Sequence, residues 1–240
     1  MAPLVRFTSK PRIERVALGD AHACYVIDDA LCEPERLADF AAAQAHEFRN
    51  VDFNYYPGTY LIPPAEVGAA LGDFFAQHVR RLFDSRRIVD LHCRLSIVTL
   101  APEALKPGQW ICHRDSAYVP PERSIQASVL YLFRDSSLGG TSFYEPLLPP
   151  QEAARLLHDS TTLDAAAFAQ KYTIERGYMC GSNAYFRCIG SVPAAWNRLI
   201  FYDGGILHSG DIGAPHKLSA DPRAGRLTLN GFFTSRRRAV

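Results

Sequence analysis

The spacing of apolar residues changes along the chain, from a helical period in the first third to short strand-like runs afterwards. A short apolar run at 23–31 predicts a strand and a turn. Apolar residues then recur three and four positions apart in 34–48 and in 65–84, which predicts two amphipathic helices. Residues 1–12 contain two prolines and few apolar neighbours, so we expect a loose arm there.

From residue 91 onward the pattern predicts strands separated by Pro and Gly clusters. We expect strands in 93–101, 109–115, 125–133, 141–145, 185–192, 198–209 and 226–235, with one helical segment at 154–172. Strands and helices do not alternate regularly, which disfavours a parallel doubly wound sheet. The pattern favours a mainly β fold with flanking α-helices, a double-stranded β-helix or jelly-roll (cupin-like) barrel.

A single domain fits the length of 240 residues. We expect an N-terminal strand and helices in 13–90 to support a jelly-roll core in 91–235.

Candidate chemistry centres on 109–118, QWICHRDSAY. Alternate residues of a strand point to the same face, so His113 and Asp115 can offer a nitrogen and an oxygen to one ion. His208, which ends an apolar run beside a glycine-flanked turn, is the candidate for the third ligand. Two histidines and one carboxylate are typical of non-haem Fe(II) oxygenases. The His-x-Asp tripeptide alone is weak support, because about one such match is expected by chance in a chain of this composition.

Further motifs follow the His-x-Asp pair in a set order. They are the strand SVLYLF with Tyr131, the turn LGGTSFY at 138–144, His208, and the strand GRLTLNGFF with Arg226 and Thr228. This order resembles the Fe(II)/2-oxoglutarate-dependent dioxygenases, in particular the prolyl 4-hydroxylase-like branch, over about residues 94–234.

The resemblance implies roles for six residues. His113, Asp115 and His208 would be the catalytic metal ligands, and Arg226, Thr228 and Tyr131 would bind the far carboxylate of 2-oxoglutarate. A guanidinium suits this task because it can donate two parallel hydrogen bonds to a carboxylate.

The resemblance also implies the chemistry: Fe(II) as metal, 2-oxoglutarate and O2 as co-substrates, ascorbate as a supporting reductant, and succinate as a product. Halogenating members of the family lack the carboxylate ligand, so Asp115 favours hydroxylation of an unactivated C–H bond or a related oxidation. The expected substrate is a small molecule or peptide: an amino acid, a peptide or a natural-product intermediate.

Two departures from the family pattern affect this assignment. His208 and Arg226 are 18 residues apart, about twice the usual spacing, because of the additional segment 214–225. A register slip in the next strand would turn Arg226 to the other face. Leu100 also stands where many relatives have a tyrosine that contacts the co-substrate.

Aromatic residues with polar tips are the candidates for the substrate wall. They are Tyr56, Tyr60, Trp110 and Tyr118. The segments 50–64 and 209–225 are candidates for loops that close over the mouth of the site.

Composition excludes several other classes. The net charge of +1 argues against a general surface for nucleic acid or anionic membrane. No apolar leader and no membrane-length apolar run is present, so we expect a cytoplasmic protein, as a monomer or homodimer. The six cysteines form no CxxC pair, and Cys112, which precedes His113, is expected to point away from the metal.

Two other functions remain open at this point. A cupin-like metal enzyme would use the same barrel without 2-oxoglutarate, and Arg226 would then not face the metal. A binding module would keep the barrel without turnover. Fold alone cannot separate these hypotheses, since barrels of this kind support many functions.

Overall fold

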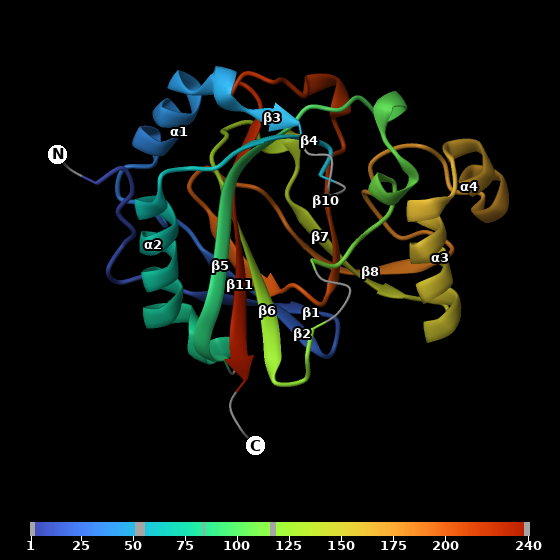
Figure 1. The fold of residues 1–240 in the computed structure, drawn as a ribbon, viewed down its shortest axis with the longest axis horizontal. Coiled ribbons are helices and arrows are strands. Elements are labelled where there is room, and N and C mark those ends of the chain that lie inside the picture. Colours follow the sequence, from blue (N-terminus) through green and yellow to red (C-terminus); the bar gives the residue numbers. More distant parts are fainter. Residues whose placement is uncertain (1–2, 51–55, 84, 116–118, 238–240) are drawn as a thin grey trace.

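The computed structural model describes residues 3–50, 56–83, 85–115 and 119–237. In these residues the chain forms two antiparallel sheets with helices on both sides (Figure 1). In spatial order, the large sheet consists of β1 (Glu14–Leu18), β2 (His22–Ile27), β9 (Leu199–Asp203), β6 (Arg123–Tyr131), β11 (Arg226–Arg237), β5 (Ser85–Val98), β4 (Gly58–Leu61) and β3 (Arg49–Asn50). The small sheet consists of β10 (Leu207–Gly210), β7 (Thr141–Pro146) and β8 (Phe186–Val192).

His113 joins the small sheet through an antiparallel bridge to His208. Its backbone N–H donates to the carbonyl of His208, and the reverse bond has the same length of 2.9 Å. From β5 onward the chain therefore passes repeatedly between the two sheets. β5, β6, β9 and β11 belong to the large sheet, whereas residue 113, β7, β8 and β10 belong to the small one.

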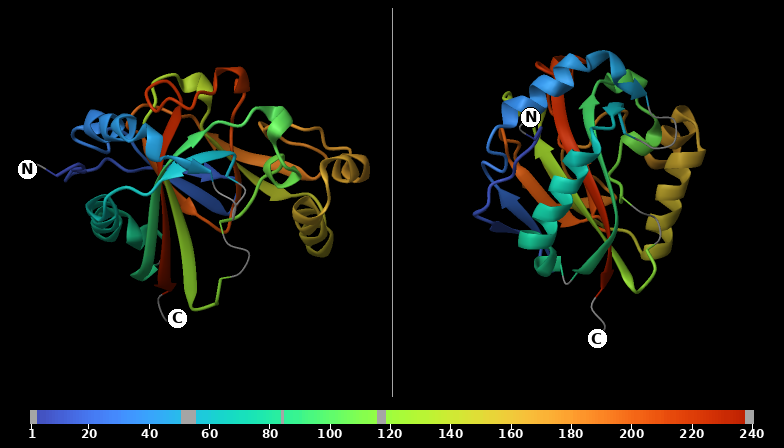
Figure 2. Two further views of the ribbon diagram at one scale, coloured as in Figure 1. Left: turned by 45° about the horizontal axis from the view of Figure 1, so that its top comes forward. Right: turned by 60° about the vertical axis from the view of Figure 1, so that its left-hand side comes forward.

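The helices α1 (Pro34–Ala43) and α2 (Ala65–Phe74) lie on one side of the sheets, and α3 (Pro150–Thr162) and α4 (Ala165–Tyr172) lie on the other (Figures 1 and 2). Proline at the first position of α1 and of α3 suits a helix start, because its missing N–H would have no partner in the first turn.

Three apolar clusters hold these layers together. The first lies between α1, α2 and the large sheet, the second between the two sheets, and the third between the small sheet and α3 with α4. In β11, Leu227 and Leu229 belong to the first cluster, so the alternate residues Arg226 and Thr228 face the small sheet. This alternation places polar side chains of the large sheet in the space between the sheets.

The predicted helices are present, but their ends differ from the prediction. The helix expected in 34–48 ends at Ala43, and a 3-10 turn follows at Ala45–Glu47. In the stretch expected as 65–84, α2 gives way to a π-helical turn, Phe75–Val79, and a 3-10 turn, Arg80–Phe83. Phe75 and Val79 in these turns are still buried, so the apolar face of the helix continues through them.

Several predicted elements are wrong in detail. The expected strand 109–115 is a 3-10 turn, Pro107–Gln109, followed by the single bridge at His113. The strand expected to start at 93 begins at Ser85. The helical segment 154–172 is two helices, because Asp164 accepts a hydrogen bond from the Ala167 N–H at 2.8 Å and caps a second start.

The N-terminal segment is docked rather than loose in its described part, residues 3–12. Phe7 forms a β-bridge with Leu31, and its ring stacks on Phe74 with ring centroids 4.8 Å apart. Val5 is buried in the first cluster.

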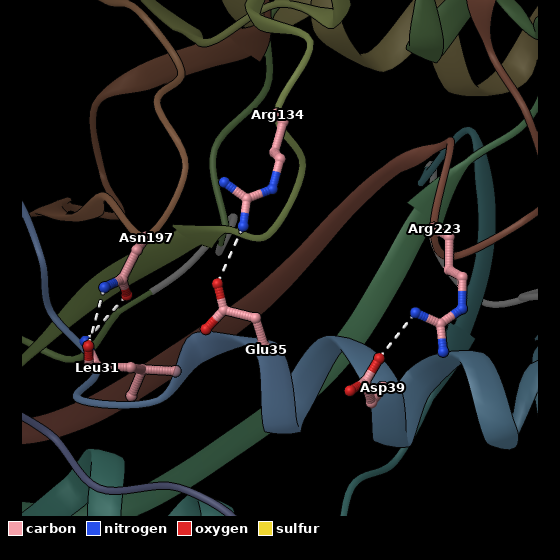
Figure 3. A network of polar contacts seen from close by, with 6 residues as sticks. All are labelled: Leu31, Glu35, Asp39, Arg134, Asn197 and Arg223. Carbon is pink, nitrogen blue, oxygen red and sulfur yellow. Dashed lines mark hydrogen bonds and ion pairs between the residues drawn. The ribbon is translucent and has the colours of Figure 1, made fainter.

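Polar contacts tie α1 and the turn before it to loops far away in the sequence (Figure 3). The side-chain amide of Asn197 accepts from the N–H of Leu31 and donates to its carbonyl, both at 2.9 Å. Arg134 donates to Glu35 at 2.9 Å. These contacts fix the entry of α1 against the loops that follow β6 and precede β9.

The additional segment 214–225 is ordered by its own turns and by α1. Arg223 pairs with Asp39 of α1 at 2.7 Å (Figure 3). Gly225 ends the segment at a close approach, since a Cβ there would lie 2.1 Å from the carbonyl oxygen of Ser219. The chain leaves this turn directly into β11, with Arg226 as its first residue.

None of the helices in the described parts of the chain combines the length and apolar character that a membrane span requires.

Candidate metal and co-substrate site

The structure brings His113, Asp115 and His208 together from separate parts of the chain. Their ligand atoms, one from each side chain, all lie within 4.8 Å of one another. His208 Nε2 is 3.5 Å from Asp115 Oδ1, and the two imidazole centroids are 4.5 Å apart. The bridge between residues 113 and 208 sets this geometry, because it aligns the two histidines across neighbouring strands.

Hydrogen bonding orients His208 as a ligand. Its Nδ1 lies 2.9 Å from the carbonyl oxygen of Ile206, and a carbonyl can only accept, so the proton resides on Nδ1. This leaves Nε2, which faces Asp115, as the nitrogen that a metal ion would bind in place of a proton. A histidine held through its other ring nitrogen is the usual arrangement at protein metal sites.

Burial and mutual charge set the protonation of the three groups. Desolvation of the imidazole, followed by the nearby charge of His208, lowers the pKa of His113 to about 4, although part of the residue faces solvent. Burial acts to lower the pKa of His208, but the charge and hydrogen bond of Asp115 raise it overall. Burial acts to raise the pKa of Asp115, but His208, His113 and Arg94 lower it overall. The carboxylate is therefore ionised and His113 neutral at neutral pH, as metal ligation requires.

One carboxylate oxygen of Asp115 is buried without a hydrogen-bond partner among the described residues, namely Oδ2. Gly204 backs this carboxylate: its carbonyl accepts the Asp115 N–H at 3.0 Å, and a Cβ on Gly204 would lie 2.9 Å from Oδ2. A buried anionic oxygen without a donor is costly unless a cation is bound. The donor set and this oxygen both fit a divalent metal ion.

A cavity of about 120 Å³ adjoins the three side chains and lies between the sheets. Its wall includes His113, Asp115 and His208 on one side, together with residues of β11 and of the loops around them. The lining residues of β11 are Arg226, Thr228, Asn230 and Phe232, which alternate along the strand. The strand therefore keeps the register that turns Arg226 toward the metal ligands.

Arg226 is 5% exposed and is held by the glycine turn before β7. Its Nε donates to the carbonyl of Gly139 at 3.1 Å and its Nη2 to the carbonyl of Gly140 at 2.8 Å. Gly139 has φ of +89°, and a Cβ there would lie 1.7 Å from the carbonyl oxygen of Asp211. The two glycines of this turn thus allow a close backbone approach that positions the guanidinium.

No carboxylate of the described residues forms an ion pair with Arg226. Nη1 makes no hydrogen bond to any described residue either, and the nearest rings are those of Tyr131 and Phe133, at 5.9 and 5.7 Å from the guanidinium carbon. A buried cation without an anion is expensive. The arrangement therefore suits an anionic ligand that enters the cavity.

Three hydroxyls surround this arginine. Thr228 lines the cavity beside it, and its Oγ1 contacts the carbonyl of Ser96 at 3.5 Å. The hydroxyls of Tyr131 and Thr141 are 2.8 Å apart, so Tyr131 supports the guanidinium from the second apolar cluster, and Thr141 rather than Tyr131 lines the cavity.

Tyr56 also reaches this end of the cavity, although we expected it in the substrate wall. Burial raises the pKa of Tyr56 to about 12, against opposing contributions from the charge of Arg226 and from hydrogen bonding to Thr228. Tyr56 thus lies near Arg226 and Thr228, at the end of the cavity where the co-substrate is predicted to bind.

The other predicted wall residues have different positions. Tyr60 lies on β4 opposite Ser96, beside the cavity but outside its lining. Trp110 does not line this cavity: it is buried in the third cluster, where its indole N–H donates to the carbonyl of Leu105 at 3.0 Å. Tyr118 lies outside the described residues.

Two lining tyrosines were not predicted from the sequence. Tyr202 on β9 is buried, and its ring packs edge-on against His208 with centroids 4.8 Å apart. Tyr178 comes from the loop between α4 and β8, and its hydroxyl donates to the carbonyl of Leu100 at 2.6 Å. The alternation in β9 could have indicated the first, but no local pattern marks the second. Cys112 is buried in the third cluster, away from the metal ligands.

Comparison with known proteins gives one family match. The sequence model described as "Family of unknown function (DUF6445)" matches residues 9–233. A search of curated proteins finds no match.

Solved structures similar to this chain include a Pseudomonas putida prolyl-4-hydroxylase, at 16% identity and a TM-score of 0.49, with 91% of this chain and 95% of that chain covered. The non-heme alpha ketoglutarate dependent carbocyclase SnoK from nogalamycin biosynthesis is similar at 14% identity and a TM-score of 0.49, with 90% and 83% covered. HygX from Streptomyces hygroscopicus, solved with nickel and 2-oxoglutarate bound, is similar at 11% identity and a TM-score of 0.45, with 90% and 84% covered.

Proposed function

We propose that this chain, which belongs to the family of unknown function DUF6445, is an Fe(II)- and 2-oxoglutarate-dependent dioxygenase. The proposed reaction is hydroxylation of an unactivated C–H bond of an amino acid, a peptide or a natural-product intermediate. The observation that carries the proposal is Arg226, a buried guanidinium without a carboxylate partner among the described residues, which faces the same cavity as His113, Asp115 and His208.

The metal would be held by His113, Asp115 and His208. Two imidazoles and one carboxylate on one side of an ion leave its opposite side open, which is the arrangement of non-haem Fe(II) oxygenases. The unpartnered Oδ2 of Asp115 and the orientation of His208, which is held through Nδ1, support this assignment.

When bound, iron and 2-oxoglutarate together supply the oxidation: O2 is consumed, 2-oxoglutarate loses CO2 to become succinate, and one oxygen atom enters the substrate C–H bond. The protein's own part is binding and orientation. Arg226 would bind the far carboxylate of 2-oxoglutarate, with Thr228 and Tyr56 adding hydroxyl groups beside it. The rings of Tyr202 and Phe232 would limit the access of water to the cavity.

The strand order supports the corresponding fold. After β5 the strands pass between the large and the small sheet in the manner of a double-stranded β-helix, with residue 113 and β10 as neighbours in the small sheet. We infer that the two sheets form the walls of a jelly-roll barrel and that the cavity is its interior. The proposal places the protein in the cytoplasm as a monomer or homodimer without nucleic-acid or membrane partners.

The experiment is an assay of succinate by mass spectrometry with fresh Fe(II), ascorbate and 2-oxoglutarate, with and without O2. Slow oxygen-dependent succinate formation is expected even without the true substrate, because the first half-reaction needs only the metal, 2-oxoglutarate and O2. Asp115→Ala should abolish it, because the variant removes the anionic ligand.

The alternatives give different results. A cupin-like metal enzyme would bind metal at the same residues, but Arg226→Met would not affect its metal-dependent reaction. A binding module would bind 2-oxoglutarate or metal and form no succinate. Absence of oxygen-dependent succinate across a broad panel of added peptides and amino acids would contradict the proposed function.

A further inference from the structure

A second arginine, Arg94, lies on the same inner face of the large sheet. It is on β5 opposite Asn230 of β11, and paired residues of antiparallel strands share a face. Asn230 and Phe232 both line the cavity. Arg94 is therefore on the same face of the sheet as these two lining residues, beside the cavity but outside its lining.

Aromatic rings flank the Arg94 guanidinium. Its central carbon lies 4.7 Å from the ring centroid of Phe232 and 5.8 Å from that of Tyr60. Cation–π contacts at such distances hold a guanidinium by its faces and leave its N–H edge available for a ligand.

Arg94 has no ion pair and no side-chain hydrogen bond to any described residue, although it is half-buried. Desolvation lowers the pKa of Arg94, and electrostatic interactions with Tyr56 and then Asp115 oppose this effect. A partly desolvated guanidinium with unused donors is stabilised when an anion binds.

Arg94 and Arg226 are separate sites. In the cross-strand register Arg226 is opposite Val98, and Arg94 is opposite Asn230, four residues further along β11. Four residues of a strand span roughly 14 Å. The contact with Phe232, which is two residues further still, directs Arg94 away from the co-substrate end.

The charges around the cavity also leave room for one more anion. Fe(II) would bring two positive charges, and Arg226 and Arg94 one each, whereas Asp115 brings one negative charge. The two carboxylates of 2-oxoglutarate compensate two of the three remaining positive charges. A single carboxylate of the substrate, placed beside Arg94, would compensate the last one.

We infer that Arg94 anchors the substrate and that the substrate carries a carboxylate, either the α-carboxylate of a free amino acid or the C-terminal carboxylate of a peptide. This inference rests on the proposed function and narrows its substrate class. A carboxylate is favoured over a phosphate because one charge is uncompensated and because a planar carboxylate matches the edge of a guanidinium stacked between two rings.

The test measures binding to metal-free protein, so it does not depend on turnover. The probes are the common amino acids and N-acetylated dipeptides, each as the free carboxylate and as the carboxamide, together with inorganic phosphate and 2-oxoglutarate. Thermal stabilisation identifies the probes that bind, and titration calorimetry gives their Kd. The proteins are wild type, Arg94→Met, Arg94→Lys, Arg226→Met and Arg87→Met, the last as a matched exposed arginine on the same strand.

The expected result is at least one carboxylate probe that binds wild type and whose carboxamide binds at least about tenfold more weakly. Arg94→Met should weaken binding of that probe by at least about tenfold. Arg94→Lys should weaken it by less, because lysine keeps the positive charge but cannot donate the two parallel hydrogen bonds of a guanidinium. Arg226→Met and Arg87→Met should leave its Kd within about threefold. Binding by the amino acid or by the dipeptide identifies the source of the carboxylate.

Several outcomes would overturn the inference: no carboxylate probe binds, the carboxamide binds equally well, only phosphate binds, or both Arg94 variants bind within about threefold of wild type. Failure of the proposed function is seen separately, in anaerobic titrations of 2-oxoglutarate into the same proteins loaded with Mn(II). In that case 2-oxoglutarate does not bind Mn(II)-loaded wild type, or its Kd does not respond to Arg226→Met, while the metal-free carboxylate probe still responds to the Arg94 substitutions.

Discussion

Replacing Arg226 with methionine removes the guanidinium and keeps most of the side-chain volume in the cavity wall. Two carbonyl groups lose a donor, but the carbonyl of Gly140 still accepts the N–H of Asp211 at 3.1 Å. The carbonyl of Gly139 has no second donor of this kind among the described residues, so it would be left without a hydrogen bond. An unsatisfied buried group costs about 1–3 kcal/mol, and removal of an uncompensated buried charge offsets part of that cost. We therefore expect a folded variant.

The effect on 2-oxoglutarate should be much larger than the effect on stability. Loss of one partner of a buried, hydrogen-bonded charge pair costs about 2–5 kcal/mol of binding free energy. At about 1.4 kcal/mol per factor of ten, this raises the Kd by roughly 30-fold to several thousand-fold. The same ligand should stabilise wild type against unfolding by about 2.7 kcal/mol at 100 times its Kd, and the variant much less.

The assay is anaerobic titration calorimetry of 2-oxoglutarate with Mn(II) in place of Fe(II), which avoids turnover. Arg236→Met is the control, because Arg236 is an exposed arginine on the same strand. A folded Arg226→Met variant that binds 2-oxoglutarate within threefold of wild type would refute the assignment of the co-substrate site.

Two further predictions concern groups at the candidate site, and a third concerns an ion pair elsewhere in the fold. Gly204→Ala should weaken Mn(II) binding by about tenfold or more, because the new Cβ would approach the unpartnered oxygen of Asp115. Equal Mn(II) affinity in the variant and in wild type would contradict this prediction. Tyr56→Phe should raise the Kd for 2-oxoglutarate by about 2- to 12-fold, because one hydroxyl is lost. The same calorimetry measures this Kd, and an unchanged value would place the hydroxyl outside the pocket. The Arg198 guanidinium donates two hydrogen bonds to Asp28 and lowers the pKa of that carboxyl below its ordinary value of 3.8, so Asp28→Asn should lose stability at neutral pH. The difference in unfolding free energy should shrink as the pH falls through the lowered pKa, and chemical denaturation that shows the same difference at about pH 2 would contradict the pairing.

The sequence was sufficient to predict most strands and the grouping of His113, Asp115 and His208. The period-two pattern of 226–235 placed Arg226 and Thr228 on one face, and the structure shows that the 12-residue segment before them does not disturb this register. The segment closes on itself through the turn at Gly225, so its length has no effect on the strand.

Features that depend on contacts distant in the sequence were not predictable. The first half of β5 mixes charged and apolar residues without a regular alternation, and its pairing with the end of β11 makes it a strand. Phe7 docks because of Phe74, more than sixty residues away. Trp110 looked like a wall residue beside His113, but the 3-10 turn before it directs the indole into the cluster with Phe168.

Arg94 was missed for a similar reason. In the sequence it is one polar residue in an apolar strand. Its proposed role in binding is indicated only by its contact with the ring of Phe232 on the next strand and by the charges around the cavity.

The most direct measurement is an anaerobic crystal structure with Fe(II) and 2-oxoglutarate. The account predicts one iron ion bound by His113, Asp115 and His208, with the near end of 2-oxoglutarate on the metal and its far carboxylate on Arg226. Iron at other residues, or 2-oxoglutarate bound away from Arg226, would contradict it.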